Sequence, residues 1–235
     1  MGYATDGENT SNSTVGGLAF YIGDIRRNYS PLYFNRTHTF VQSVILEAPF
    51  GKGQRFLTSG VAGKVLGGWE ISSVLTSMTG LPLQITGGSN LSAPGNTGVP
   101  DRIGDIKVLH GIGAAAPWFD VTRGTNPSDG LLCLGVVCQA PNCPGPTCRI
   151  GNIARRVFTG PGLFNFDASL FRRFRMTERL GLEFRAEAFS LTNTPHFDRP
   201  GTNFDSSSSF GVVTGTRGGN DGGNRSIELG AKLTF

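Results

Sequence analysis

Four cysteines are the most concentrated set of reactive side chains in the chain. Cys133, Cys138, Cys143 and Cys148 follow one another at intervals of five residues in the Pro- and Gly-rich stretch CLGVVCQAPNCPGPTC. Structural zinc sites favour two-residue gaps within a ligand pair, and the closest histidine in the sequence is His110. An even number of cysteines in a loop with little core of its own favours two disulfides in an oxidising compartment, and three pairings are open.

No other group of residues predicts catalysis. His38, His110 and His196 lie in separate segments, and no G-x-S-x-G signature accompanies them. The stretches GGSNLSAPGNTG and GTRGGNDGGN look superficially like phosphate-binding loops, but neither connects a strand to a helix. We therefore expect neither an enzyme nor a bound metal or cofactor.

Alternating charges in ERLGLEFRAEAF, residues 178–189, are a different kind of signal. Leu182 and Phe184 share one parity and Glu183, Arg185 and Glu187 the other, so a strand here has one apolar and one charged face. In a soluble sandwich the apolar face meets a second sheet, whereas in an outer-membrane barrel it meets lipid and the charged face lines the lumen. The candidate lumen-facing polar residues are Asp167, Arg173, Arg175, Glu183, Arg185 and Glu187. They either contact a plug or a substrate, or neutralise one another on adjacent strands.

Composition predicts the fold class. The 235 residues include 35 Gly and 13 Pro with 16% charged residues, which suits strands joined by irregular loops, and we expect an all-β chain. No apolar run approaches the roughly 20 residues of a membrane-spanning helix, and the opening MGYATDGENTSNSTVGG lacks the features of a signal peptide. The net charge of +4 is modest, so no nucleic-acid partner is expected.

Alternation and β-branched residues predict five strands. Their ranges are 36–50, 68–86, 163–176, 178–192 and 225–235, with a tight hairpin turn at 176–178. Residues 87–162 and 193–224 are long polar loops, and residues 1–35 are the tail of another. The loop 87–162 has no sustained apolar period, so we expect it to be poorly ordered outside a cross-linked piece near 133–148.

The connections differ in length in a regular way. Long, medium, long, short and long segments follow one another, so the long loops fall on one side of the sheet and the tight turn on the other. Outer-membrane barrels have this asymmetry, with short periplasmic turns and long extracellular loops. The pattern predicts an antiparallel transmembrane β-barrel in the bacterial outer membrane, with 87–162 and 193–224 extracellular.

Several segments together resemble a known family. They are GNIARRVFTGPGLFNFDASLFRRFRMTERLGLEFRAEAFSLTNTPHFDRPG, FGVVTGTRGGNDGGNRSIELGAKLTF, RTHTFVQSVILEAPFGKGQRF, GGWEISSVLTSMTGLPLQIT and the pair Trp118, Phe119 with Asp120. In their order along the chain they resemble the C-terminal end of the Oar-like TonB-dependent receptors of Acidobacteria and related bacteria. The resemblance covers roughly residues 30–235.

The resemblance implies a large outer-membrane barrel, usually of about 22 strands, with an N-terminal plug. Such receptors take up scarce substrates with energy that TonB transmits from the inner membrane. Five strands are fewer than the roughly 8 of the smallest bacterial barrels, so we expect an incomplete barrel, the C-terminal fragment of a longer receptor. The implied partners are outer-membrane lipid, the barrel assembly machinery, the plug and TonB. The alternative is a secreted β-sandwich or adhesin-like module, whose apolar residues would need a facing sheet.

The last strand resembles a β-signal, which hands a barrel to the assembly machinery. IELGAKLTF alternates apolar residues up to a terminal aromatic, which makes this set the candidate signal: Ile227, Leu229, Ala231, Leu233 and Phe235. Such a strand presents an unpaired edge for strand addition, while its aromatic side chain lies in the interface girdle.

Overall fold

The structure is a computed structural model. It describes residues 2–3, 26, 29–51, 53–56, 59–87, 98–140, 151–156, 158–175, 177, 180–217 and 222–235. The chain divides into two compact units. The first, here the loop unit, comprises Met1–Thr37, Thr79–Gly162 and Phe197–Gly215, and the second, the strand unit, comprises His38–Met78, Leu163–His196 and Thr216–Phe235.

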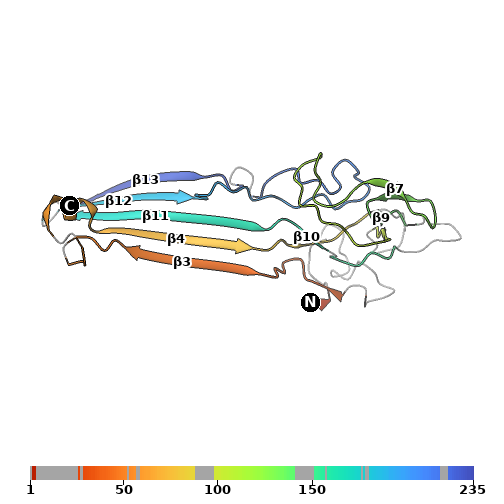
Figure 1. Ribbon diagram of the computed structural model, residues 1–235, viewed down its shortest axis with the longest axis horizontal. Coiled ribbons are helices and arrows are strands. Elements are labelled where there is room, and N and C mark those ends of the chain that lie inside the picture. Colours follow the sequence, from red (N-terminus) through yellow and green to blue (C-terminus); the bar gives the residue numbers. More distant parts are fainter. Residues whose placement is uncertain are drawn as a thin grey trace. The chain divides into compact units, whose positions relative to one another are not determined.

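The strand unit is built on one antiparallel sheet. Its strands are β3 (Thr39–Glu47), β4 (Trp69–Met78), β11 (Leu163–Arg175), β12 (Gly181–Phe189) and β13 (Ser226–Thr234). They lie side by side in the order β13-β12-β11-β4-β3 (Figure 1), and every neighbouring pair is antiparallel. Each strand lies within one of the five predicted ranges, so these predictions are confirmed.

The ends of the sheet differ in the connections they carry. At one end Arg175 pairs with Gly181 and Glu47 with Glu70, so the chain reverses there through a tight turn and a medium segment. At the other end Met78 pairs with Leu163 and Phe189 with Ser226, so both long segments leave from that end. The predicted segregation of connection lengths is therefore present in the sheet. We call the first end the turn end.

A short helix interrupts the medium connection. Helix α1 (Gly60–Leu66) has seven residues, and β4 begins three residues after it. Gly67 ends the helix in extended conformation, and a Cβ there would lie 2.7 Å from the Cα of Gly51 and 2.5 Å from the carbonyl oxygen of Gly63. Glycine is therefore required where α1 approaches the end of β3. Within the described residues no helix is long and apolar enough to cross a membrane.

The loop unit contains short strands. They are β1 (Gly2–Tyr3), β2 (Tyr29–Ser30), β5 (Pro82–Leu83), β6 (Asp101–Arg102), β7 (Arg123–Thr125), β8 (Leu132–Leu134), β9 (Val137–Cys138) and β10 (Phe158–Thr159). Strands β6, β9, β8 and β7 form one sheet in that order, and β10 pairs with β5 and β1 with β2. Predicted strand 68–86 therefore divides into β4, which belongs to the strand unit, and β5, which belongs to the loop unit.

The loop unit has a hydrophobic core of its own. Phe119 is fully buried and packs edge-on against Phe158 and Phe210, with ring centroids 4.9 and 5.1 Å apart. Phe204 extends this aromatic cluster from Phe210. The remaining core residues are Leu83, Ile85, Val99, Trp118, Leu134, Val137, Ile153 and Val213. The prediction that 87–162 is poorly ordered outside a cross-linked piece is wrong for 98–140, because apolar residues without any period converge from several segments.

A disulfide links two neighbouring strands of the loop unit. Cys133 on β8 bonds to Cys138 on β9, and the two residues occupy directly opposite positions in the pair. Both are buried. The bond joins two of the four candidate cysteines, while Cys143 and Cys148 lie outside the described residues.

Removing this disulfide is expected to weaken the loop unit moderately. Closing so short a loop in the unfolded chain corresponds to about 2 kcal/mol of stability in the chain-entropy model. The double variant Cys133→Ser/Cys138→Ser should lose about that much free energy of unfolding in urea titrations monitored by the fluorescence of buried Trp118. The matched control is Cys143→Ser/Cys148→Ser, and an equal or greater loss in that variant would contradict the expectation.

Candidate functional site

The register of the five strands sorts their side chains into two faces. Residues directly opposite one another point to the same face of a sheet. The polar face carries Glu47, Glu70, Ser72, Thr76, Asn165, Asp167, Ser169, Arg173, Glu183, Arg185, Glu187, Glu228 and Lys232, with the apolar Val41, Ile45, Val74, Phe171 and Phe189 among them. The opposite, apolar face carries Phe40, Val44, Leu46, Ile71, Leu75, Phe164, Phe166, Leu170, Leu182, Phe184, Ile227, Leu229 and Leu233, with the polar Gln42, Ser73, Ser77 and Arg172 among them.

The apolar face is exposed. Leu229 is 73% exposed and Ile227 63%, and Phe40, Leu46, Ile71, Phe164 and Leu233 are exposed as well. In the described part of the strand unit, no second sheet packs against them. A contiguous apolar surface of this kind is costly in water and is the expected state of a lipid-facing sheet. The sandwich alternative requires a facing sheet and is not supported.

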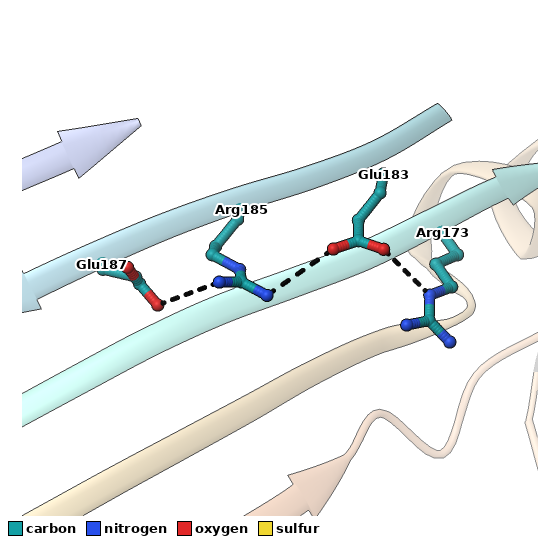
Figure 2. Close-up of polar contacts among 4 residues, drawn as sticks. All are labelled: Arg173, Glu183, Arg185 and Glu187. Atoms are coloured by element: carbon teal, nitrogen blue, oxygen red, sulfur yellow. Dashed lines mark hydrogen bonds and ion pairs between the residues drawn. The ribbon is translucent and has the colours of Figure 1, made fainter. Parts of the chain in front are cut away.

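Four charges on the polar face form a continuous ladder (Figure 2). Arg173 on β11 donates from Nε to Oε2 of Glu183 on β12 at 3.2 Å. On β12 itself, Arg185 lies between two carboxylates, with 3.6 Å to Oε1 of Glu183 and 3.8 Å to Oε1 of Glu187. The prediction that Glu183, Arg185 and Glu187 share one face, opposite Leu182 and Phe184, is confirmed.

The surroundings of the ladder favour mutual neutralisation. The side chains of Arg173 and Arg185 are 73% and 52% exposed. Both guanidinium groups also lie over the ring of Phe171, at 5.1 and 5.8 Å from its centroid. Exposed ion pairs contribute little to stability, so the ladder sets the charge pattern of this face more than it holds the sheet together.

Replacing Glu183 is therefore expected to have a small effect. Glu183→Gln removes two ion pairs and keeps the shape of the side chain, and it should change the free energy of unfolding by less than about 1 kcal/mol. A double-mutant cycle with Arg173→Gln, measured by urea unfolding, isolates the pair itself. A coupling energy of several kcal/mol would mean that the ladder is a buried structural element.

Asp167 has a structural task at the end of β12. Its Oδ1 accepts a hydrogen bond from the backbone N–H of Ser190 at 2.8 Å, and its Oδ2 accepts one from the amide of Asn165 at 2.8 Å. Asn165 in turn accepts a hydrogen bond from the Ser190 hydroxyl. Ser190 has a positive φ of 49°, which is unusual for a residue other than glycine. Asp167 and Asn165 therefore hold the backbone where the chain leaves the sheet.

The polar face also contains two pairs of like charges that sequence analysis missed. Glu187 lies directly opposite Glu228, and Glu47 directly opposite Glu70. Like charges in these positions destabilise a strand pair, and only the register reveals them. Arg175 ends β11, and its side chain lies outside the described part of the chain.

A shallow hollow of about 140 Å³ lies beside the ladder. Its polar lining includes Ser72, Asp167, Ser169 and Glu187. The hydroxyls of Ser72 and Ser169 are 2.7 Å apart and bond to each other across β4 and β11. The hollow and the ladder together make the polar face the candidate functional surface, with hydroxyl and carboxylate groups available to a polar ligand.

The motif of Trp118, Phe119 and Asp120 is structural in this chain. The indole N–H of Trp118 donates to the carbonyl oxygen of Thr159 at 3.0 Å, and Phe119 is in the core. Asp120 accepts hydrogen bonds from the hydroxyl and the backbone N–H of Thr122, and these bonds lower the pKa of its carboxyl group. The motif thus fixes a turn against the core of the loop unit.

The described histidines, cysteines and acidic residues form no metal site. Among the described residues no three histidine, cysteine or acidic side chains are grouped so that they could hold a metal ion. His196 binds the carbonyl oxygen of Phe164 through Nε2 at 3.1 Å, and the His110 ring packs edge-on against Trp118. His196 therefore has its partner within the strand unit, and His110 has its partner within the loop unit.

The last strand lies at an edge of the sheet. β13 pairs only with β12 among the described strands, and its residues are exposed along its whole length. Ile227, Leu229, Ala231 and Leu233 occupy the apolar face in register, and Phe235 is 96% exposed beyond them. This geometry suits strand addition by another protein. The role of these five residues as a β-signal stays a prediction.

Deleting Phe235 tests that role. If Phe235 completes the signal, the deletion should leave synthesis and export unchanged and reduce the amount folded into the outer membrane several-fold. The measurement is the ratio of folded to unfolded protein in isolated outer membranes, and Phe235→Ser provides a second variant. Thr234→Ser, which keeps the terminal aromatic, is the control. Undiminished assembly of the deletion would contradict the prediction.

An antiparallel sheet with one exposed apolar and one polar face is the signature of a strand-built membrane protein. A family model described as an outer membrane beta barrel domain matches residues 3–228. No curated protein and no solved structure matches the chain. Because the matched range covers most of the chain, the chain belongs to this outer-membrane β-barrel family. Its location is the bacterial outer membrane, and the predicted fold, an antiparallel all-β barrel that is not closed, is confirmed.

Proposed function

We propose that the chain forms the C-terminal part of the barrel of a TonB-dependent outer-membrane receptor, which takes up its substrate actively. The observation that carries the proposal is the two-faced sheet with its connections segregated by length. The resemblance of five segments to Oar-like receptors adds the receptor type. In this proposal the apolar face meets lipid and the polar face lines the lumen.

The polar face has the properties that a plugged lumen needs. In the charge ladder Arg173 and Arg185 are exposed and Glu183 and Glu187 are half-buried. Two charges of each sign balance, so the ladder can lie against a plug without a large field of one sign. The hollow lined by Ser72 and Ser169 supplies hydrogen-bonding groups beside it. The long segments 87–162 and 193–224 are extracellular in the proposal, and the core of the loop unit gives them a defined surface for capturing a substrate.

Two adjacent serines on β4 provide the test. Ser72 lies on the polar face and Ser73 on the apolar face. A photoreactive phenylalanine analogue at each position, in the receptor expressed from its complete gene, reports what each face touches. We expect the probe at Ser72 to cross-link to a plug within the same receptor and the probe at Ser73 to cross-link to lipid.

Energy coupling is tested separately. Cells that express the complete receptor should accumulate its substrate with TonB and lose accumulation without it. If the probe at Ser72 cross-links to a plug but uptake does not depend on TonB, the result would contradict active transport. The assignment of the chain to a plugged barrel would then remain. A probe at Ser72 that reacts with lipid would contradict the lumenal assignment of the polar face. A reading frame upstream that encodes neither a plug nor further strands would contradict the receptor class.

A further inference from the structure

Helix α1 presents an apolar surface that nothing in the described part of the strand unit covers. Val61, Val65 and Leu66 are 78%, 57% and 48% exposed. The helix is not free to turn this surface inward, because Gly67 packs directly on the backbone of Phe50 and Gly51. The position of α1 is therefore fixed while its apolar side chains remain exposed.

The C-terminal end of α1 is bound to the apolar face of the sheet. The carbonyl oxygen of Val65 accepts a hydrogen bond from the indole N–H of Trp69 at 3.1 Å. It also accepts one from the guanidinium group of Arg172 on β11. Trp69 and Arg172 are paired across β4 and β11, so both project from the apolar face. The surface of α1 thus continues the apolar face at the turn end.

Arg172 is enclosed by aromatic rings. Its guanidinium carbon lies 5.2 Å from the ring centroid of Trp69 and 4.1 Å from that of Phe174. Trp69 packs edge-on against Phe174 and Phe184, at 6.4 and 6.1 Å between centroids. The side chain of Arg172 is consequently buried although it projects from the apolar face.

These residue types mark a particular depth in a membrane. An arginine on the lipid-facing side of a barrel costs about 2 to 4 kcal/mol at the bilayer midplane and about 0 to 1 kcal/mol near the interface. Tryptophan and other aromatic side chains concentrate at that interface, where an apolar ring and a polar N–H are both accommodated. The row of Arg172, Trp69 and Phe184 therefore belongs at the edge of the hydrocarbon region.

We infer that α1 and this aromatic row form an interfacial anchor, consisting of Val61, Val65, Leu66, Trp69, Arg172, Phe174 and Phe184. Its partner is the phospholipid boundary between acyl chains and headgroups at the turn end of the sheet. The apolar side chains of α1 enter that boundary, and the Trp69–Arg172 pair fixes the height at which the sheet sits. The inference depends on the outer-membrane location and not on active uptake.

Tryptophan fluorescence can measure this contact, because Trp69 and Trp118 are the two tryptophans in the chain. In the Trp118→Phe variant, the signal of Trp69 is the difference from the Trp69→Phe/Trp118→Phe variant. Because the five described strands do not close a barrel, the protein expressed from its complete gene is folded into phosphatidylethanolamine/phosphatidylglycerol vesicles. Their lipids carry bromine either near the ester or near the end of the acyl chain. We expect bromine near the ester to quench Trp69 at least about twice as strongly as bromine near the chain end.

Helix α1 is probed by a second pair of variants. Val61→Trp and Val41→Trp are each made in a Trp69→Phe/Trp118→Phe background. Val61 is on α1, whereas Val41 lies on the polar face of β3 and is similarly exposed, at 58%. We expect shallow bromine to quench the reporter at position 61 and to leave the one at position 41 accessible to aqueous acrylamide.

Two results of the quenching experiment would overturn the inference. Equal quenching at positions 61 and 41 would overturn the inference, since α1 would then face water. Stronger quenching of position 61 by bromine at the chain end would overturn it too, because α1 would then lie in the hydrocarbon. If Val61→Trp does not fold, Val65→Trp tests the same surface, and Val65 accepts both hydrogen bonds through its backbone, which the substitution keeps.

Discussion

Phe119→Ala is expected to unfold the loop unit or to leave it marginally stable. Phe119 is fully buried, and its ring packs against Phe158 and Phe210, which come from distant parts of the sequence. Truncating a buried phenylalanine costs about 3 to 5 kcal/mol through lost burial and the cavity that remains. Limited proteolysis should cleave within 98–140 much faster in the variant, and the emission of Trp118 should shift towards that of water-exposed indole.

A matched control uses the same residue type in the same unit. Phe34 is 59% exposed, so Phe34→Ala should change the stability by less than about 1 kcal/mol. Resistance of Phe119→Ala to protease at the level of Phe34→Ala would show that the aromatic cluster does not hold these segments together. The long loops would then be ordered by some other contact.

Leu229→Arg is expected to block insertion of the sheet into a bilayer. Leu229 lies in the middle of β13 on the apolar face and is 73% exposed. If that face meets lipid, an arginine there costs about 2 to 4 kcal/mol, which reduces the folding equilibrium constant in vesicles roughly 30- to 1,000-fold. Urea titration of the receptor expressed from its complete gene, folded into phospholipid vesicles, measures the loss.

The neighbouring residue is the control for charge alone. Glu228→Arg places the same side chain on the polar face, opposite Glu187. It replaces a pair of like charges with a pair of opposite charges, so stability should remain or rise slightly. Equal losses in Leu229→Arg and Glu228→Arg would contradict the assignment of the two faces to lipid and lumen.

The strands could be predicted because a two-residue period leaves a direct trace in sequence. Leu182 and Phe184 alternate with Glu183 and Arg185, and this alternation holds whether the apolar face meets lipid or another sheet. The turn near Thr177 was predictable for the same reason, since the alternating runs on both sides leave little room between them. The polar residues of β12 that share a face with Glu183 could be identified from odd and even positions alone.

The register and the contacts that depend on it could not be predicted. Nothing in the sequence indicates that Glu228 lies opposite Glu187 and not two residues further along, because a shift of two keeps every side chain on its face. The task of Asp167 depends on the backbone of Ser190, which follows the partner strand. The sequence therefore predicted a lumen-facing Asp167 but not its hydrogen bond with the backbone of Ser190.

The loop unit escaped prediction for another reason. Ile85, Phe119 and Phe210 share one core although long glycine-rich segments separate them in sequence. Isolated apolar residues have no period, so they resemble the ordinary apolar content of a loop. Helix α1 is similarly hidden, since seven residues with two glycines give too short a window for a helical period.

The direction of the outer strands constrains how this sheet can close. β3 and β13 run in the same direction, because four antiparallel steps separate them. The edges of β3 and β13 that have no partner among the described strands therefore cannot meet as antiparallel neighbours, either within one chain or head to tail between copies. A barrel that is antiparallel throughout has an even number of strands, so an odd number of additional strands must bridge β13 and β3. Parity thus excludes every ring that is antiparallel throughout and is made only of copies of this five-stranded sheet joined edge to edge in one direction.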